Sequence, residues 1–299
     1  MKENPLVSIV IVGMNVERFL PACLGSVEGL DYPQDRVETI YVDNASSDGS
    51  VGYVGKNHPR VRVLRNARNL GFSGGNNVGL RAARGDYLVL LNADAELEGH
   101  WLSRMLSCFS DDQSVGIAGC KIYYSGTRTL QHAGGYYDAD VRFGHYGIFE
   151  EDRGQYDARR EVGYVMAAAM MISRKCLDAI GLFDPHYFIY CEEIDWAEAA
   201  RRAGFKVVYV PDAVARHHEM SFMGGRTRRF YLLYLRNRYR FIIKYFGLRW
   251  FLKACAKDLS DRGGRATDVP WKASHLLAGC AWNLIHLPVT IRCRGRRFR

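Results

Sequence analysis

The stretch LVLLNADAELE, residues 88–98, joins an apolar run to two oxygen-bearing side chains. Leu88 to Leu91 have the pattern of a buried strand. Asn92 and Asp94 follow one residue apart, and extended backbone at this point directs both side chains to the same face. The pair alone favours an ordinary strand end, since Asn and Asp are common turn residues. Two hard oxygen ligands on one face also suit a divalent cation that touches phosphate.

Strand and helix patterns alternate around this stretch, which predicts an α/β fold with a sheet that is largely parallel at its start. The acidic helix pattern EEIDWAEAARRAGF opens with carboxylates, as the helix dipole favours, and stops at Gly204. Residues 125–161 lack periodicity and are expected to form a long functional loop region. The expected strands are 6–13, 37–44, 61–66, 86–92, 114–124 and 206–211; the expected helices are 17–28, 71–84 and 192–205; residues 162–174 return to the core.

Polar side chains follow each of the first four strands. In open sheets of this kind, ligands bind beyond the carboxyl ends of the strands. A single polar residue after a strand is common in any loop, whereas polar residues after four strands in succession predict a single site. The residues concerned are Asn15, Asp43 and Asp48, Asn69, and finally Asn92 with Asp94.

The charge is unevenly distributed. Residues 226–299 hold 18 Lys and Arg against 3 Asp and Glu, while the first 225 residues hold 23 basic and 29 acidic residues. Residues 228–253 interleave the basic residues with Phe, Tyr and Trp. We expect helices that lie on an anionic membrane surface; a packing extension with a core of aromatics and a dimerisation surface are the alternatives.

The eight cysteines are scattered, with no C-x-x-C and no Cys/His cluster. The sequence therefore predicts neither a disulfide framework nor a zinc site, and it favours a reducing cytoplasm. The first residues fit a strand better than a signal peptide.

Six segments occur in an order that resembles family 2 glycosyltransferases of the GT-A fold, and in particular rhamnosyltransferase-like members that build surface polysaccharides. Each motif alone is weak, but their order and spacing are specific. The resemblance covers roughly residues 5–245. The segments are SIVIVGMN, VDNASSDGS, NLGFSGGNNVGL, LLNADAELE, GLFDPHYFIYCEEIDWAEAARRAG and PDAVARHH.

The resemblance implies a fold and a division of the chain. The fold is a Rossmann-like mixed sheet with helices on both faces, followed by a basic helical C-terminal extension. The catalytic domain would span 1–225, with a nucleotide-sugar half at 1–112 and an acceptor half at 113–225, and the extension would span 226–299.

The resemblance also implies site roles. Asp94 would be the main ligand of Mg²⁺ or Mn²⁺, with His217 as the second. Glu193 would be the general base, with Glu192 and Asp195 beside it. The segment QHAGG (131–135) would shape the acceptor site. Nucleotide binding would fall to Asn15, Asp43, Asp48, Asn69, Asn77 and Asn92.

The sequence departs from the family's usual pattern at three positions. Asn92 replaces a more usual Asp, Met14 stands where an aromatic often precedes Asn15, and Glu193 stands where the base is often Asp. Either Glu192 or Glu193 remains open as the base. Each acid could instead cap a helix, and His217 could be an ordinary loop residue.

The implied reaction is a single displacement with inversion, in which a carboxylate acts as base and a metal supports the departing diphosphate. The expected partners are a UDP- or dTDP-sugar and a glycan or lipid-linked acceptor, with no nucleic acid; oligomeric state stays open. The expected location is the cytoplasmic face of the inner membrane.

Three other function classes remain as alternatives. The basic end favours nucleic-acid binding but leaves the acidic site without explanation. A nucleotidyltransferase should carry a Gly-rich basic phosphate loop, which SIVIVGMNVERF is not. A catalytically impaired family member, which binds nucleotide sugar only, receives support from Asn92 and Met14.

Overall fold

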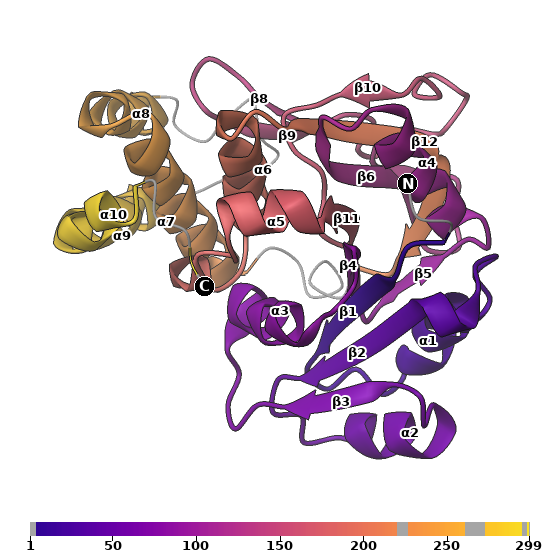
Figure 1. Ribbon diagram of the computed structural model, residues 1–299. Helices are drawn as coiled ribbons and strands as arrows, with labels where there is room; N and C mark the ends of the chain where they lie inside the picture. Colours follow the sequence, from indigo (N-terminus) through magenta and orange to yellow (C-terminus); the bar gives the residue numbers. More distant parts are fainter. Residues whose placement is uncertain (1–3, 220–226, 261–272, 295–297, 299) are drawn as a thin grey trace.

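The computed structural model describes residues 4–219, 227–260, 273–294 and 298. Within them, ten strands form one mixed sheet in the order β10-β12-β6-β11-β4-β1-β2-β3, with β5 paired to β12 and β7 to β6 (Figure 1). β8 and β9 form a separate two-stranded sheet. The strands are β1 Val7–Gly13, β2 Val37–Asp43, β3 Arg62–Arg65, β4 Tyr87–Asn92, β5 Ala95–Leu97, β6 Val115–Tyr124, β7 Leu130–His132, β8 Gly135–Tyr137, β9 Phe143–His145, β10 Arg160–Glu161, β11 Ala169–Ser173 and β12 Lys206–His217.

The first four strands form the parallel part of the sheet, as the sequence predicted. β1 pairs in parallel with both β2 and β4, and β2 pairs in parallel with β3. The side chains of Val7, Ile9, Val10 and Ile11 are fully buried, because helices cover both faces of a parallel sheet. β11 then runs antiparallel to β4 and β6, which makes the sheet mixed.

Helices cover both faces, which confirms the predicted arrangement. One core cluster joins the sheet to α1, α2 and α4, and the other joins it to α3, α5, α6 and α7. The helices are α1 Leu20–Glu28, α2 Ser50–Asn57, α3 Gly71–Ala82, α4 Trp101–Asp111, α5 Arg174–Ile180, α6 Glu192–Arg202, α7 Arg228–Tyr245, α8 Leu248–Ser260, α9 Ala273–Ile285 and α10 Leu287–Arg292, with short 3₁₀ helices at Gln34–Arg36 and Pro185–Tyr187.

Two predicted segments differ from the structure. Residues 125–161 carry the short strands β7 to β10 in addition to loops. β12 continues six residues beyond the predicted end, to His217. Its pairing with β6 shifts register between Val210 and Val214, where Pro211 has no N–H for the ladder. After this irregularity β12 pairs with β5, and this brings His217 to the end of β4.

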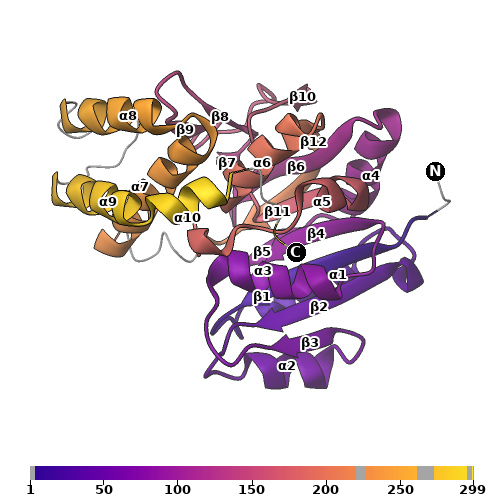
Figure 2. The ribbon, with the colours of Figure 1, turned by 60° about the vertical axis from the view of Figure 1, so that its left-hand side comes forward.

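The first helix of the basic extension is part of the core. α7 lies between α6 and the outer helices α8, α9 and α10 (Figure 2). The expectation of a helix that lies on an anionic membrane surface is wrong for Arg238 and Arg240, since both side chains are fully buried and do not face a membrane. Arg240 pairs with Asp184 at 2.8 Å and donates to Thr290. The predicted domain boundary near residue 225 lies outside the described residues.

A buried ion cluster fastens α7 to α8. Asp258 accepts from Arg238 at 2.5 Å and from the Tyr239 hydroxyl at 2.8 Å, and Arg142 lies 3.5 Å from its other oxygen. Buried charges are tolerated only when they are paired, since the loss of one partner leaves the other without compensation. In the described part of the chain no helix is both long and apolar enough to span a membrane.

Replacing the buried carboxylate should therefore destabilise the fold. We expect Asp258→Ala to lower the free energy of unfolding by about 3–5 kcal/mol, because it removes the carboxylate that pairs with the buried guanidinium of Arg238. Urea denaturation measures this loss. Glu151→Ala is the matched control, since its partner Arg153 is 79% exposed and such pairs contribute about 0–1 kcal/mol. Equal losses in both variants would contradict the proposed role of the cluster.

Candidate functional site

The carboxyl ends of β1, β2 and β4 lie side by side at one edge of the sheet (Figure 1). Gly13 pairs with Asp43, and Val12 pairs with Asn92, so the loops after these strands start at the same level. The end of β12 joins this edge, since His217 pairs with Ala95 of β5. The structure thus gathers predicted residues that lie far apart in the sequence.

Asn92, Asp94 and His217 form a compact group at this edge. His217 Nε2 lies 3.1 Å from Asp94 Oδ1 and 3.1 Å from Asn92 Nδ2. The side chains of His217 and Asp94 are only 8% and 12% exposed. The backbone N–H of His218 donates to the Asp94 carbonyl at 3.0 Å, which fixes the two segments relative to each other.

Gln131 fixes the tautomer of His217, a role that the sequence interpretation missed. Its Nε2 donates to Glu219 at 2.7 Å, so its Oε1 faces His217 Nδ1 at 2.9 Å. Nδ1 must therefore carry the proton, and Nε2 presents a lone pair. That lone pair accepts from Asn92 but also faces a carboxylate oxygen of Asp94. Such an arrangement is favourable with a metal cation between the two acceptors.

Another group of possible metal ligands has a structural role. Asp184, His186 and Cys293 lie within metal-binding reach of one another among the described residues. Asp184, however, already accepts from His186 and from the buried guanidinium of Arg240, which lowers its pKa despite burial. A cation there would compete with Arg240, so this group fastens α7 and α10.

The loops after β1 and β2 hold each other in place. Asn15 has a positive φ of 57°, and its Oδ1 accepts from the backbone N–H of Ser47 at 2.8 Å. Asp43 is buried and accepts from the backbone N–H of Ser46. Asp48 accepts from Ser50 and from the backbone of Glu17, so it shapes the start of α2. Asp48 therefore shapes the helix, whereas Asn15 and Asp43 lie at the ends of β1 and β2, where the nucleotide was predicted to bind.

The two asparagines of the Gly-rich segment have different surroundings. Asn69 Nδ2 lies 3.1 Å from the sulfur of Met14, so Asn69 sits beside the end of β1. Asn77 is buried, and its amide both donates to and accepts from the backbone of Phe183. Both ends of the Asn77 side chain are occupied by packing of α3, and we therefore leave it out of the nucleotide site.

Glu192 and Glu193 stand together at the start of α6. Burial, followed by the charge of Glu193, raises the pKa of Glu192 well above its usual value. Burial raises the pKa of Glu193 from 4.5 to about 7. Glu192 Oε2 is buried and has no hydrogen-bond partner within the described residues, whereas Glu193 is partly exposed. A partly exposed carboxylate that titrates near neutrality is suited to accept a proton.

The loop before these acids is strained and is clamped by α7. Phe188, Tyr190 and Cys191 all have φ between 64° and 74°, a region costly for such residues. Asn237 of α7 is fully buried, and its Nδ2 donates to the carbonyls of residues 187, 189 and 190 at 2.8–2.9 Å. The sequence interpretation missed this clamp, although Asn237 is the one uncharged amide in the basic and aromatic run 228–253.

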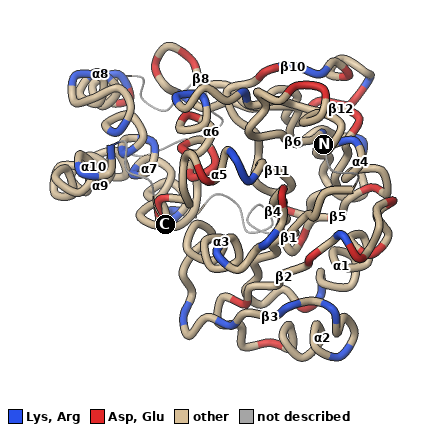
Figure 3. Tube along the Cα trace, in the orientation of Figure 1, with Lys and Arg blue, Asp and Glu red and all other residues tan. Residues whose placement is uncertain are grey.

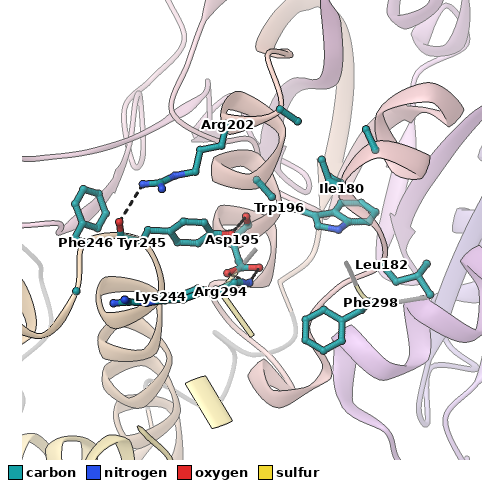
Figure 4. A pocket seen from close by; sticks show the side chains of 14 residues that line it. Ile180, Leu182, Asp195, Trp196, Arg202, Lys244, Tyr245, Phe246, Arg294 and Phe298 are labelled. Atoms are coloured by element: carbon teal, nitrogen blue, oxygen red, sulfur yellow. Dashed lines mark hydrogen bonds and ion pairs between the residues drawn. The ribbon is translucent and has the colours of Figure 1, made fainter. Parts of the chain in front are cut away.

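Asp195 does not belong to the acid pair. Both of its carboxylate oxygens accept from Lys244 at 2.7 Å, and one also accepts from the Tyr187 hydroxyl. It lines a cavity of about 570 Å³ between α6 and the end of α7, with Trp196, Tyr245 and Arg202 around it (Figure 4). The structure thus assigns Asp195 to the contact of α6 with α7, and the predicted catalytic role has no geometric support.

Tyr190 links the acid pair to the His217 group. Burial raises the pKa of its phenol first, and then the nearby carboxylates of Glu192 and Glu219 raise it further. Glu219 is the residue that orients Gln131. The backbone N–H of Ser73 also donates to the Phe188 carbonyl, so the Gly-rich start of α3 borders the same loop. The predicted nucleotide, metal and acid segments therefore surround one region.

Comparison with known proteins identifies the family. Residues 8–181 match the sequence family described as glycosyl transferase family 2. An N-acetylglucosaminyl-diphospho-decaprenol L-rhamnosyltransferase of Mycobacterium tuberculosis is 24% identical over 243 residues, which cover 71% of this chain and 74% of that protein. An uncharacterized protein, y4gI, of Sinorhizobium fredii is 31% identical over 84% of this chain, and the match spans only 28% of its length.

Solved structures share the fold. GalNAc-T7 with UDP, GalNAc and Mn²⁺ superposes with a TM-score of 0.69 at 18% identity, over 96% of this chain and 55% of that one. The mannosyltransferase PcManGT of Pyrobaculum calidifontis, with GDP-Man and Mn²⁺, superposes with a TM-score of 0.60 at 17% identity, over 98% of this chain and 86% of that one. These neighbours confirm the GT-A fold. Together with the family match, they establish that the chain belongs to glycosyl transferase family 2.

Proposed function

We propose that this glycosyltransferase moves a sugar from a nucleoside diphosphate to a hydroxyl of a glycan or lipid-linked acceptor, with inversion of the anomeric configuration. The observation that carries the proposal is the separation of two kinds of chemistry: the Asp94–His217 pair, which suits a cation, at the sheet edge, and the acid pair at the start of α6. The mycobacterial relative makes rhamnose one candidate sugar, and surface polysaccharide synthesis the candidate pathway.

Asp94 and His217 would hold a divalent metal, and their chemistry fits one. A carboxylate oxygen and an imidazole lone pair 3.1 Å apart are suitable donors, and the nitrogen ligand favours Mn²⁺ over Mg²⁺, which prefers oxygen ligands. When bound, the metal supplies positive charge to the departing diphosphate. Gln131 accepts from Nδ1, so the other ring nitrogen, Nε2, is the one directed at the metal position.

The nucleotide would lie over the ends of β1 and β2. Asn15, Asp43 and Asn69 border this edge, and Met14 is one of the few large apolar side chains exposed there. A flexible sulfur-bearing side chain gives a polarizable contact for the face of a base. UDP and dTDP are the candidate nucleotides.

Glu193 would act as the general base. It accepts the proton of the acceptor hydroxyl as the hydroxyl oxygen bonds to the anomeric carbon and the bond from that carbon to the diphosphate breaks. Its pKa of about 7 leaves it partly ionised at neutral pH, which suits proton transfer in both directions. A single displacement of this kind inverts the anomeric carbon.

A second candidate is a family member that binds nucleotide sugar without transfer. Asn92 favours this second candidate. Its side-chain amide donates to His217 and, unlike an aspartate, adds no negative charge to the metal site. Three basic residues of the run that suggested nucleic-acid binding, Arg238, Arg240 and Lys244, are buried and paired with acids, so they are not available to nucleic acid. Turnover that is lost in Glu193→Gln while nucleotide binding persists would separate transfer from binding alone.

Nucleotide binding should depend on metal and on Asp94. A ligand that binds only the native state stabilises it by about 2.7 kcal/mol at roughly 100 times its Kd. We expect thermal stabilisation by UDP or dTDP with Mn²⁺, and loss of the metal-dependent part in Asp94→Ala. Asp111→Ala, an exposed acid paired with Arg159, is the control. Unchanged metal dependence in Asp94→Ala would exclude Asp94 as the ligand.

Glu193→Gln should abolish transfer and alter the pH dependence of stability. We expect at least a ~100-fold loss of turnover, while metal-dependent nucleotide binding persists; wild-type turnover should rise as pH passes through 7. Because the folded pKa of Glu193 is raised, the folded state retains a proton between about pH 4.5 and 7, and stability falls as pH rises through that window.

The Glu193→Gln variant should therefore be more stable than the wild type at pH 8, by an amount that disappears below pH 4.5. Chemical denaturation at both pH values measures this difference. Glu192→Gln is the informative partner variant. Loss of turnover in Glu192→Gln with full turnover in Glu193→Gln would assign the base to Glu192 and contradict our assignment.

A further inference from the structure

The outer helices of the extension carry most of the exposed large apolar side chains. Eight of the eleven such side chains in the described residues fall between residues 248 and 291. They lie on α8, α9 and α10, which form the outer layer of the molecule on the side away from the sheet (Figures 1 and 2). The eight are Leu248, Trp250, Leu252, Leu259, Leu277, Leu284, Ile285 and Ile291.

Four of these leucines form one strip along the contact between α8 and α9. Cys255 and Cys280 meet at this contact, with their sulfurs 2.9 Å apart. Positions three before and four after a residue share its side of a helix. Leu252 and Leu259 hold these positions around Cys255, and Leu277 and Leu284 hold them around Cys280. We call these four residues the leucine strip; each is 48–62% exposed.

α9 has the composition of a helix that is covered on its outer side. The helix Ala273–Ile285 has no Asp, Glu, Lys or Arg, although Leu277, Leu284 and Ile285 face outward. Exposed apolar patches of this kind mark surfaces that bind a partner or a membrane. Its inner side packs on α7, where Asn283 donates to the backbone of Arg236.

The rim of the leucine strip is cationic. Its exposed or partly exposed charged side chains are Arg249, Lys253, Lys257, Arg292 and Arg294. Lys257 and Lys253 lie 2.6 Å and 4.0 Å from the Asp140 carboxylate, and Arg294 donates to the Ile243 carbonyl. The single acid in the described residues from 248 to 294, Asp258, is buried and paired with Arg238. Figure 3 shows the Lys and Arg positions along α8 and at α10. Apolar side chains beside basic ones, with Trp250 at the boundary, are typical of helices that bind the interface of an anionic bilayer.

We propose that the leucine strip and its basic rim dock this protein on an anionic lipid bilayer, with α8 and α9 in the plane of the headgroups. A second copy of the chain fits less well, because a symmetric contact through the strip would bring two cationic rims together. A bilayer with anionic headgroups can bury the apolar strip and attract the basic rim at the same time. The proposal concerns a surface separate from the Asp94–His217 group and needs no sugar donor.

Flotation of the full chain with lipid vesicles tests the proposal. We expect binding to vesicles of mixed phosphatidylcholine and phosphatidylglycerol, weaker binding to phosphatidylcholine alone, and a decrease as salt screens the rim. Leu252→Ser, Leu259→Ser, Leu277→Ser and Leu284→Ser combined should lower binding at least about tenfold. Phe149→Ser, an exposed apolar residue outside the strip, should bind like the wild type.

A charge variant, together with sedimentation to measure the mass of the protein in solution, distinguishes bilayer binding from dimerisation. Arg249→Glu with Arg292→Glu should weaken binding to the anionic vesicles several-fold and leave binding to phosphatidylcholine unchanged. Wild-type binding by the folded leucine variant would overturn the proposal. So would a wild-type dimer in sedimentation that the leucine variant converts to a monomer, with no vesicle binding by either. Because no turnover is measured, neither result depends on the proposed transferase activity.

Discussion

Three carbonyl groups of one strained loop accept hydrogen bonds from the Asn237 side chain, and the position of the acid pair depends on this contact. Positive φ at three non-glycine residues is not a conformation that the loop would keep alone. The clamp comes from α7, so the basic extension contributes to the candidate site as well as to the outer surface. Arg236 adds to it by donating to the carbonyls of residues 186 and 187.

Three buried aspartates of this protein are compensated by basic side chains, whereas the acid pair of α6 is not. Asp195, Asp184 and Asp258 are paired with Lys244, Arg240 and Arg238. Glu192 and Glu193 form no ion pair among the described residues, and their pKa values rise accordingly. An uncompensated acid pair lowers stability at neutral pH, and function is the usual reason to retain one.

The sequence predicted what local patterns determine. The apolar runs of β1 and β4 identified the buried strands, and the polar residues after them identified the edge where Asp94 and His217 meet. The roles given to Asn77 and Asp195 were not supported, since each depends on a partner remote in sequence, Phe183 and Lys244. The contact of Gln131 with His217 and the clamp by Asn237 were missed for the same reason, although Gln131 belongs to the segment expected to shape the acceptor site. The domain boundary near residue 225 remains a prediction.

The central claim is that one carboxylate base and one metal-supported leaving group act from separate places in a single displacement. Proton NMR of the product formed in the first turnovers, or of the free sugar from slow donor hydrolysis, tests it most directly. The account predicts an anomeric configuration opposite to that of the donor, lost together with all turnover in Glu193→Gln. A product that retains the donor configuration would require a second displacement and would contradict the account.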